Sequence, residues 1–189
     1  MVVLERVCQP LHRYTFKAPL IKEWVENHCI EGETILNLFA GMTRLREDLN
    51  EIRVDLDIET NPHFCMDALT FVKLENEHSN SAKYGTVILD PPYAYRKSME
   101  KYKGIIASPF RQLKDEIVTL LSIGGRVITF GYHSSGMGAG RGFELTNVLL
   151  ICHGGAQHDT IAIVEKKVKE VTLERKYDSS ELDELMDLL

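Results

Sequence analysis

The stretch Thr86-Val87-Ile88-Leu89-Asp90-Pro91-Pro92-Tyr93 decides how this sequence is interpreted. Its first half is a run of β-branched and apolar residues, which is typical of a strand buried on both faces inside a parallel sheet. Pro91 ends this strand, because proline has no N–H to donate to a neighbouring strand and its φ is fixed. The strand therefore delivers Asp90 and Tyr93 to its carboxyl end. In open α/β sheets, ligands bind at that edge.

The segment Asp90-Pro91-Pro92-Tyr93 resembles the Asp/Asn-Pro-Pro-aromatic motif of class I, S-adenosylmethionine-dependent amino-methyltransferases. That family includes methylases of adenine N6 and cytosine N4 in DNA and some RNA methylases. The resemblance implies that Asp90 and the carbonyl of Pro91 accept the two N–H bonds of an amino group on a base, which stabilises its attack on a methyl group. Tyr93 is expected to stack on that base. The alternative from the residues alone is a strand that ends in an Asp-Pro turn.

A second buried strand runs into a glycine turn at Phe39-Ala40-Gly41. It is similar to the family motif Asp/Glu-x-Phe-x-Gly-x-Gly, which surrounds the methionine end of S-adenosylmethionine. Phe39 and Gly41 match this motif, and Gly41 permits a positive φ and a close approach of the backbone to a ligand. Two positions differ, because Asn37 replaces the acid and Thr43 replaces the second glycine. Asn37 can still accept from the cofactor's ammonium through its amide oxygen. Either the affinity is lower or a carboxylate elsewhere compensates.

An aromatic–basic pair, Phe16 and Lys17, comes just before a helix that we expect from Pro19 to about Asn27. The pair resembles the segment that lies against the methionine part of the cofactor in the same family. Alternatively, Phe16 only packs as a hydrophobic staple at the start of the helix.

Acidic residues follow the next expected strand, which covers residues 52–57. In the family, the acid at the end of this strand bonds both ribose hydroxyls, since a carboxylate accepts two O–H bonds at once. Asp55 is the first candidate and Asp57 is the alternative. Further along, Asp67 and Ala68 are similar to the site that receives the adenine amino group of the cofactor. Asp67 can also cap the helix that begins at Ala68.

Basic and aromatic residues follow the Asp-Pro-Pro-Tyr segment, because residues 94–104 contain four bases, one acid and two aromatics. This composition suits a nucleic-acid strand with an extruded base, although a solvated loop has the same composition. The glycine-rich stretch 132–142 follows another strand, so we expect a mobile substrate loop at the same cleft, or a flexible loop without specific contacts. The candidate substrate contacts are Tyr95, Arg96, Lys97, Lys101, His133 and Arg141.

The bulk composition indicates one soluble domain. The chain has 189 residues, 44% of them hydrophobic, with a net charge of −6, and this length allows a sizeable core. No apolar run approaches the roughly 18 residues of a membrane span, and the early acid Glu5 does not fit a signal peptide, so we expect a cytoplasmic protein without membrane contact. Cys8, Cys29, Cys65 and Cys152 are widely spaced, which disfavours a disulfide framework or a zinc site, and we expect no metal.

Three parts are expected along the chain: an irregular N-terminal arm over residues 1–15, a methyltransferase domain over 16–167 and a charged tail over 168–189. The end of the tail has five acids and no base between residues 178 and 189. It is either disordered or a short amphipathic helix that docks on the body or on a protein partner.

The domain itself is expected to be shortened at one edge of its sheet. Only about six residues separate Asp57 from Phe64, which is too few for the helix of a parallel crossover. The other expected elements are helices over residues 43–51 and 108–122, and an antiparallel hairpin over 147–153 and 160–165.

Together these motifs predict an α/β fold, a Rossmann-like three-layer sandwich with a mostly parallel sheet and an antiparallel closing strand. The resemblance implies an S-adenosylmethionine-dependent methyltransferase acting on an exocyclic amino group of a nucleobase. Adenine N6 in DNA is the favoured substrate, and DNA is favoured over RNA as partner. Cytosine N4 and an RNA base (adenine N6 or guanine N2) stay open, as do a methylase of small-molecule or protein amines and a non-catalytic nucleic-acid-binding subunit. The sequence does not determine the oligomeric state.

Overall fold

The computed structural model describes residues 1–78, 82–91, 110–155 and 157–173. The helices within these ranges are α1 (Pro19–His28), α2 (Ala68–His78) and α4 (Phe110–Ile117), with 3-10 turns η1 (Thr15–Lys17), η2 (Ile58–Thr60), η3 (Val118–Leu120) and η4 (Ala139–Arg141). The strands are β1 (Val3–Cys8), β2 (Ile35–Leu38), β3 (Glu51–Asp55), β4 (Phe64–Cys65), β5 (Tyr84–Leu89), β6 (Leu121–Gly131), β7 (Phe143–Cys152) and β8 (Thr160–Lys167).

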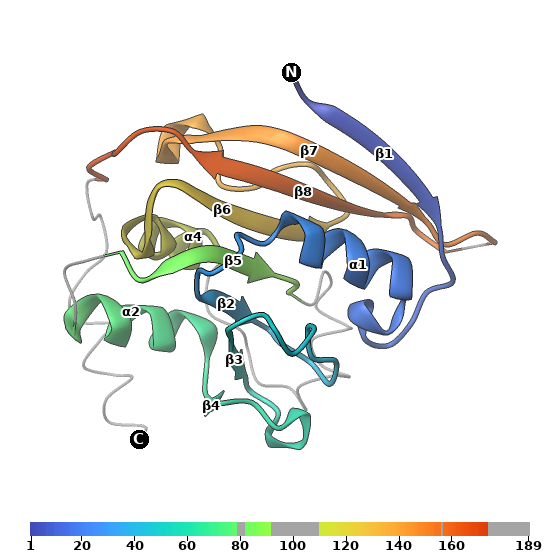
Figure 1. Ribbon diagram of the computed structural model, residues 1–189, viewed down its shortest axis with the longest axis horizontal. Coiled ribbons are helices and arrows are strands. Elements are labelled where there is room, and N and C mark those ends of the chain that lie inside the picture. The colour runs from blue at the N-terminus through green and yellow to red at the C-terminus, as the bar shows by residue number, and fades with distance from the viewer. Residues whose placement is uncertain (79–81, 92–109, 156, 174–189) are drawn as a thin grey trace.

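The strands form one mixed sheet, in the order β1-β7-β8-β6-β5-β2-β3-β4 (Figure 1). β8 runs antiparallel to β6 and β7. Every other pair in this part of the chain is parallel. These findings confirm the predicted α/β class, the mostly parallel sheet and the antiparallel closing strand.

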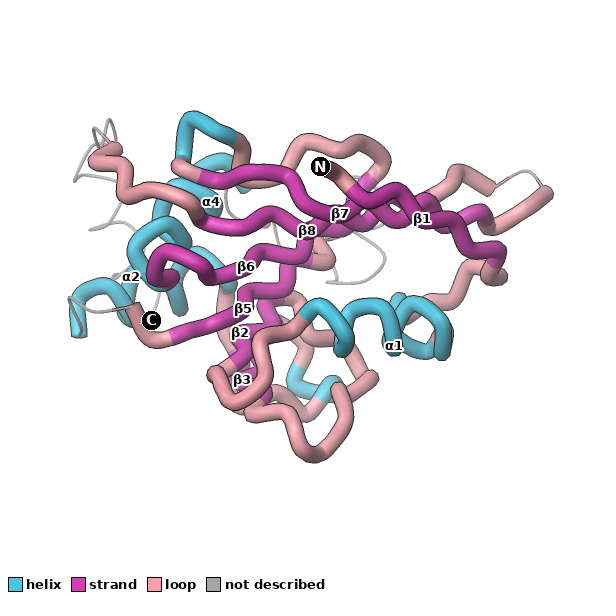
Figure 2. The backbone as a smooth tube through the Cα atoms, turned by 45° about the horizontal axis from the view of Figure 1, so that its top comes forward, coloured by secondary structure: helices cyan, strands magenta, loops and turns pink. Residues whose placement is uncertain are grey.

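The central strands are covered by helices on both faces, with α1 on one side of the sheet and α2 and α4 on the other (Figure 2). The side chains of Ile35 and Ile88 are fully buried on the α1 side, whereas Leu36 and Val87 are fully buried on the α2 side. This two-sided burial explains why β2 and β5 read as continuous apolar runs. None of the helices in the described ranges has the length and apolar content that a membrane crossing requires.

The sheet is shortened at the β4 edge, as predicted. β4 has two residues and pairs with the end of β3. The connection between these strands contains the short turn η2, with no room for a covering helix. The antiparallel hairpin is also confirmed, although its strands β7 and β8 extend beyond the predicted ranges.

The N-terminal arm differs from the expected irregular structure, because residues 3–8 form β1 and pair with β7 in parallel. Almost every residue of this edge strand is exposed, which removes the apolar alternation that would reveal a strand in the sequence. Glu5 accepts a hydrogen bond from the indole Nε1 of Trp24 at 2.7 Å and so links β1 to α1.

The predicted helix over residues 43–51 is wrong, because residues 43–50 contain turns and no helix. Side chains from other parts of the chain hold the backbone of this loop instead. The N–H of Leu45 donates to Glu51 at 3.2 Å, and the N–H of Arg46 donates to Glu26 at 2.7 Å. Tertiary contacts of this kind override the local preference for a helix.

The predicted helix over residues 108–122 is too long. Its described part ends at Ile117, η3 follows, and β6 already begins at Leu121. The ammonium group of Lys167, whose side chain is 1% exposed, donates to the carbonyls of Val118 and Leu121 at 2.9 and 2.8 Å. These bonds supply partners for carbonyls that follow the helix end, so that a glycine stop signal is not needed.

Candidate functional site

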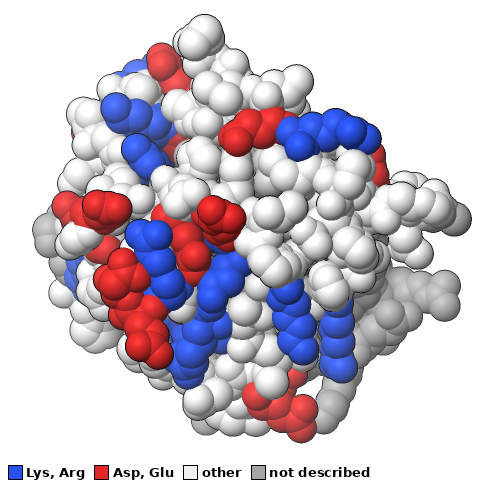
Figure 3. Space-filling view, turned by 45° about the vertical axis from the view of Figure 1, so that its right-hand side comes forward, with Lys and Arg blue, Asp and Glu red and all other residues white. Residues whose placement is uncertain are grey.

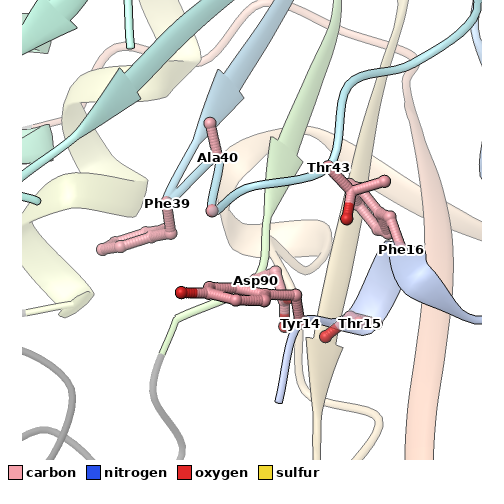
Figure 4. A pocket seen from close by; sticks show the side chains of 8 residues that line it. Tyr14, Thr15, Phe16, Phe39, Ala40, Thr43 and Asp90 are labelled. Atoms are coloured by element: carbon pink, nitrogen blue, oxygen red, sulfur yellow. The ribbon is translucent and has the colours of Figure 1, made fainter. Parts of the chain in front are cut away.

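The strands β2 and β5 are neighbours in the sheet, and the chain leaves them in opposite directions. After β2 it continues to β3 on one side, and after β5 it continues to β6 on the other. Such a reversal of strand order leaves a crevice at the carboxyl ends of the strands, where open α/β sheets bind ligands. An open pocket lies there (Figure 4), lined by Tyr14, Thr15, Phe16, Phe39, Ala40, Gly41, Thr43 and Asp90.

The turn after β2 has an unusual backbone conformation. Phe39 has a φ of +69° and Gly41 has a φ of +58°, so both residues are left-handed. This conformation costs a non-glycine residue about 1–3 kcal/mol and occurs mostly at functional sites. The N–H groups of Phe39 and Ala40 both donate to the carbonyl of Val54, at 3.0 and 3.1 Å. The neighbouring strand β3 therefore fixes this turn at the pocket.

Asp55, at the end of β3, supports the same turn. Its side chain is 3% exposed. One carboxylate oxygen accepts the N–H of Gly41 at 2.8 Å, and the other accepts the N–H of Asp57 at 3.0 Å. Asp55 is not among the described residues that line the pocket. Its carboxylate is therefore placed to hold the backbone in shape.

A buried ionic cluster lies beneath the loop that follows the turn. The fully buried guanidinium of Arg53 donates to the carbonyls of Gly41 and Thr43, the second at 3.0 Å. Glu51 lies 3.4 Å from this guanidinium. Burial lowers the pKa of Arg53, and the charge of Glu51 opposes that change. The amide of Asn37 donates to the same Glu51 carboxylate at 2.7 Å. The cluster joins β2 and β3 to the loop at the pocket.

The amide of Asn37 suits this cluster because it can donate to Glu51. A carboxylate at position 37 would instead bring a like charge to within hydrogen-bond distance of Glu51. Glu51, on the neighbouring strand, therefore supplies a carboxylate next to the amide of Asn37. Asn37 itself is fully buried and does not belong to the pocket lining that the structure describes.

The other predicted acids, Asp57 and Asp67, both cap helical turns. Asp57 accepts the N–H of Glu59 at 3.0 Å, and Asp67 accepts the N–H of Thr70 at 3.1 Å. The capping predicted for Asp67 is therefore confirmed, and Ala68, the first residue of α2, is buried in the core. Neither acid lines the pocket, but each follows a parallel strand, β3 or β4, at the same edge of the sheet.

Asp90 is the predicted catalytic side chain that the structure places at the pocket. It follows β5 directly, is half-buried, and lines the pocket together with the turn after β2 (Figure 4). Pro91 follows and is also half-buried. The other predicted residues of this region lie outside the described residues: Pro92, Tyr93, Tyr95, Arg96, Lys97 and Lys101.

The N-terminal segment supplies one wall of the pocket. Phe16 lines it as expected, and its ring packs edge-on against Phe130 with the ring centres 5.8 Å apart. Lys17 is exposed and does not line the pocket. Tyr14 and Thr15 also line it. They lie in a stretch without periodicity, close to the match at Phe16.

The two candidate residues in the stretch 132–142 lie at opposite edges of the sheet. His133 comes just after β6 at the carboxyl edge, where it is exposed and accepts the N–H of Ser135 at 3.3 Å. Because β7 starts beside the end of β8 and the beginning of β6, the stretch must cross to the other edge. Arg141 lies at that far end, so its expected place at the cleft is wrong. Its guanidinium donates to Asp115 at 2.6 Å and to the carbonyl of Met137 at 2.9 Å.

We expected this stretch to be a mobile loop, but the structure shows that it is anchored to the sheet. The carboxylate of Glu165, whose side chain is 4% exposed, accepts the N–H groups of Met137 and Gly138, the second at 2.8 Å. The sequence shows that the stretch follows a strand, but it does not show that the chain must return across the sheet to begin β7.

Comparison with known proteins shows which solved structures have a similar fold. No family model matches the sequence, and no curated protein shows significant similarity to it. The structure is similar to TrmN from Thermus thermophilus, with a TM-score of 0.53 and 15% identity over 80% of this chain and 49% of TrmN. It is also similar to the Burkholderia thailandensis 1,6-didemethyltoxoflavin-N1-methyltransferase, crystallised with 1,6-didemethyltoxoflavin and S-adenosylhomocysteine, with a TM-score of 0.52 and 12% identity over 78% of this chain and 76% of that one.

The chain spans about half the length of TrmN, so the comparison does not cover the whole of that protein. Identities of this size establish the architecture. The chain therefore has the Rossmann-like α/β fold that methyltransferases of this kind share.

Proposed function

We propose that this protein is an S-adenosylmethionine-dependent methyltransferase acting on an exocyclic amino group of a nucleobase, with adenine N6 in DNA as the leading substrate. One observation carries the proposal: Asp90 of the Asp-Pro-Pro-Tyr segment and the turn Phe39-Ala40-Gly41 line the same pocket. These two motifs are far apart in the sequence, and each is delivered by the carboxyl end of a central strand. The methyltransferase fold of the structural neighbours supports the same assignment.

The residues at the pocket fit the methionine end of the cofactor. Gly41 lines the pocket, and an added Cβ there would lie 3.2 Å from the Tyr14 ring, so a side chain at this position would press on the pocket wall. The hydroxyl of Thr43 is buried and has no hydrogen-bond partner among the residues that the structure describes. Such a group costs about 1–3 kcal/mol, and a hydrogen bond to the polar end of the cofactor would offset that cost.

The remaining cofactor contacts follow from the geometry of the acids. We assign the ribose hydroxyls to Asp57, because both oxygens of Asp55 already accept backbone N–H bonds. The cap formed by Asp57 uses only one carboxylate oxygen, Oδ1, so its second oxygen keeps the capacity to accept from a ligand. Asp67 is assigned to the adenine amino group. Asn37 acts on the cofactor indirectly, through Glu51 and the loop that this carboxylate holds.

The chemistry of methyl transfer to a base needs acceptors for its amino group. The bound cofactor supplies an electrophilic methyl group on a sulfonium. The carboxylate of Asp90 accepts one N–H bond of the amino group and the carbonyl of Pro91 accepts the other, so that the nitrogen can gain positive charge as it attacks. A charge-assisted hydrogen bond of this kind contributes about 1.5–3 kcal/mol. Tyr93 is proposed to stack on the base.

Substitution of Gly41 by alanine is expected to weaken binding of S-adenosylhomocysteine about tenfold or more, as measured by calorimetry. The added Cβ would have to push the Tyr14 ring away, at a φ of +58° that strains any residue except glycine. G32A is the matched control, because Gly32 also has a positive φ, +76°, but no heavy atom lies within 4 Å of its Cβ position. The two variants should lose similar stability, about 1–2 kcal/mol. Equal weakening of binding by both would contradict the role of Gly41.

The test of the proposed function is transfer of labelled methyl from S-adenosylmethionine to unmethylated DNA and, in parallel, to RNA, followed by nucleoside mass spectrometry. N6-methyladenine in DNA is the expected product. Label on cytosine N4 or in RNA alone would keep the mechanism and change the substrate. Cofactor binding without label in either nucleic acid would favour another amine or a missing partner. Absence of both binding and transfer would favour a non-catalytic subunit with this fold.

A further inference from the structure

Two cations flank the pocket on its N-terminal side. The guanidinium carbon of Arg13 lies 5.4 Å from the centre of the Tyr14 ring, and the ammonium nitrogen of Lys17 lies 5.8 Å from it. Tyr14 lines the pocket, whereas Arg13 and Lys17 are exposed and do not. A ligand confined to the pocket would therefore meet the ring of Tyr14. A ligand that extends out of the pocket past this ring would meet the two cations.

This arrangement is held by the fold. The turn η1 closes with a hydrogen bond from the N–H of Lys17 to the carbonyl of Tyr14 at 3.1 Å. Between these residues, Phe16 is 5% exposed and packs against Phe130 in the core. The helix α1 begins immediately afterwards at Pro19. The backbone that follows Arg13 is thus anchored, and Lys17 lies within the anchored part, which favours a preformed site.

The two cations also differ from other bases on the same protein. Lys22 pairs with Glu26 at 3.6 Å, and Arg46 pairs with Asp48 at 3.0 Å. Within the described residues, neither Arg13 nor Lys17 forms an ion pair with an acid. Figure 3 shows both situations on one face, since some Lys and Arg side chains lie against acids and others border uncharged surface.

We propose that Arg13 and Lys17 form a phosphate-binding subsite beside the reactive pocket. The Tyr14 ring separates this subsite from the pocket. The inference rests on the proposed function and deepens it: the substrate carries a phosphate next to the base that is methylated. A guanidinium and an ammonium together suit a phosphate, the first by paired hydrogen bonds and the second as a compact charge. The phosphate can belong to a nucleic-acid strand or to a free nucleotide. A free base or nucleoside would leave the subsite unused.

The test measures binding of a fluorescein-labelled, adenine-containing single-stranded DNA, in the presence of S-adenosylhomocysteine, at several salt concentrations. R13A/K17A should bind on the order of tenfold more weakly than the parent protein. Its slope of log affinity against log salt should be shallower by about 1.4, since each lost contact to single-stranded nucleic acid removes about 0.7. R13K/K17R keeps both charges and should keep most of the slope. K166A/K169A removes two exposed bases near the opposite edge of the sheet and should leave the slope unchanged.

Competition separates the two sources of phosphate. Displacement of the DNA by adenosine monophosphate but not by adenosine, lost in R13A/K17A, would support a free nucleotide as ligand. Binding that only the oligonucleotide shows would support a strand. An unchanged salt slope in R13A/K17A would overturn the subsite even if methyl transfer to DNA is observed. A matching loss of S-adenosylhomocysteine affinity would also overturn it, because the cations would then serve the cofactor. If the parent protein neither binds nor methylates nucleic acid, the proposed function fails as well.

Discussion

Replacement of Asp90 by alanine is expected to reduce methyl transfer about a hundredfold or more while binding of S-adenosylhomocysteine stays nearly the same. The reason is that Asp90 lines the pocket at the end of β5, whereas the turn that we assign to the cofactor follows β2. The substitution removes an acceptor for the charge that develops on the attacking nitrogen, and losses of one such group typically cost about 10²–10³ in rate. Single-turnover transfer and calorimetry on the same protein preparation measure the two effects.

Two further variants sharpen this test. D90N keeps the shape and one acceptor oxygen but loses the charge, so it should retain intermediate activity. E144A removes an exposed acid at the start of β7, at the opposite edge of the sheet, and should behave like the parent protein. If D90A lost cofactor binding and transfer to the same extent, Asp90 would be a structural or cofactor residue and the assigned role would be wrong.

Replacement of Arg53 by methionine is expected to lower the free energy of unfolding by about 3–5 kcal/mol, measured by urea denaturation. The substitution leaves the Glu51 carboxylate largely buried without its partner, and breaking a buried pair in this way typically costs that much. It also frees the carbonyls of Gly41 and Thr43, which the guanidinium holds at the pocket. Affinity for S-adenosylhomocysteine should therefore fall together with stability.

The origin of this loss can be separated by three companion variants. R53M/E51Q removes both charges and should recover part of the stability, because no unpaired charge is left buried. R53K keeps the charge but cannot reproduce the planar fork, so it should lie between the parent and R53M. R46A breaks exposed ion pairs and should cost about 0–1 kcal/mol. Similar losses for R53M and R46A would show that the buried cluster contributes little.

Much of the sheet could be predicted because its signals are local. The apolar runs of β2 and β5 and the glycine signal between β7 and β8 lie within short windows of sequence. The wrong predictions depended on distant side chains. The loop after Gly41 looks helical by itself, but contacts with the distant side chains of Glu51 and Glu26 hold it in another conformation. Similarly, the helix before β6 ends where the buried Lys167 reaches it from the end of β8.

The residues of the candidate site also fall into two groups, those that could be predicted from the sequence and those that could not. Phe39, Gly41 and Asp90 could be predicted because their residue types are tied to backbone conformation and to strand ends. Arg53 could not, since a buried arginine within a strand looks the same in sequence as an exposed one. The position of Arg141, at the edge of the sheet opposite the pocket, could not be predicted either. Only the strand order shows that its segment crosses the sheet.

The pairing of β1 with β7 has a consequence during synthesis of the chain. Val3 pairs with Asn147 and Cys8 pairs with Cys152, so β1 leaves the ribosome long before its partner strand β7 has been synthesised. At about 5–20 residues per second, this interval is on the order of ten seconds. Throughout it, the apolar residues Val3 and Leu4 have no partner strand and are open to chaperones. β1 is therefore translated well before β7 and is incorporated into the sheet late.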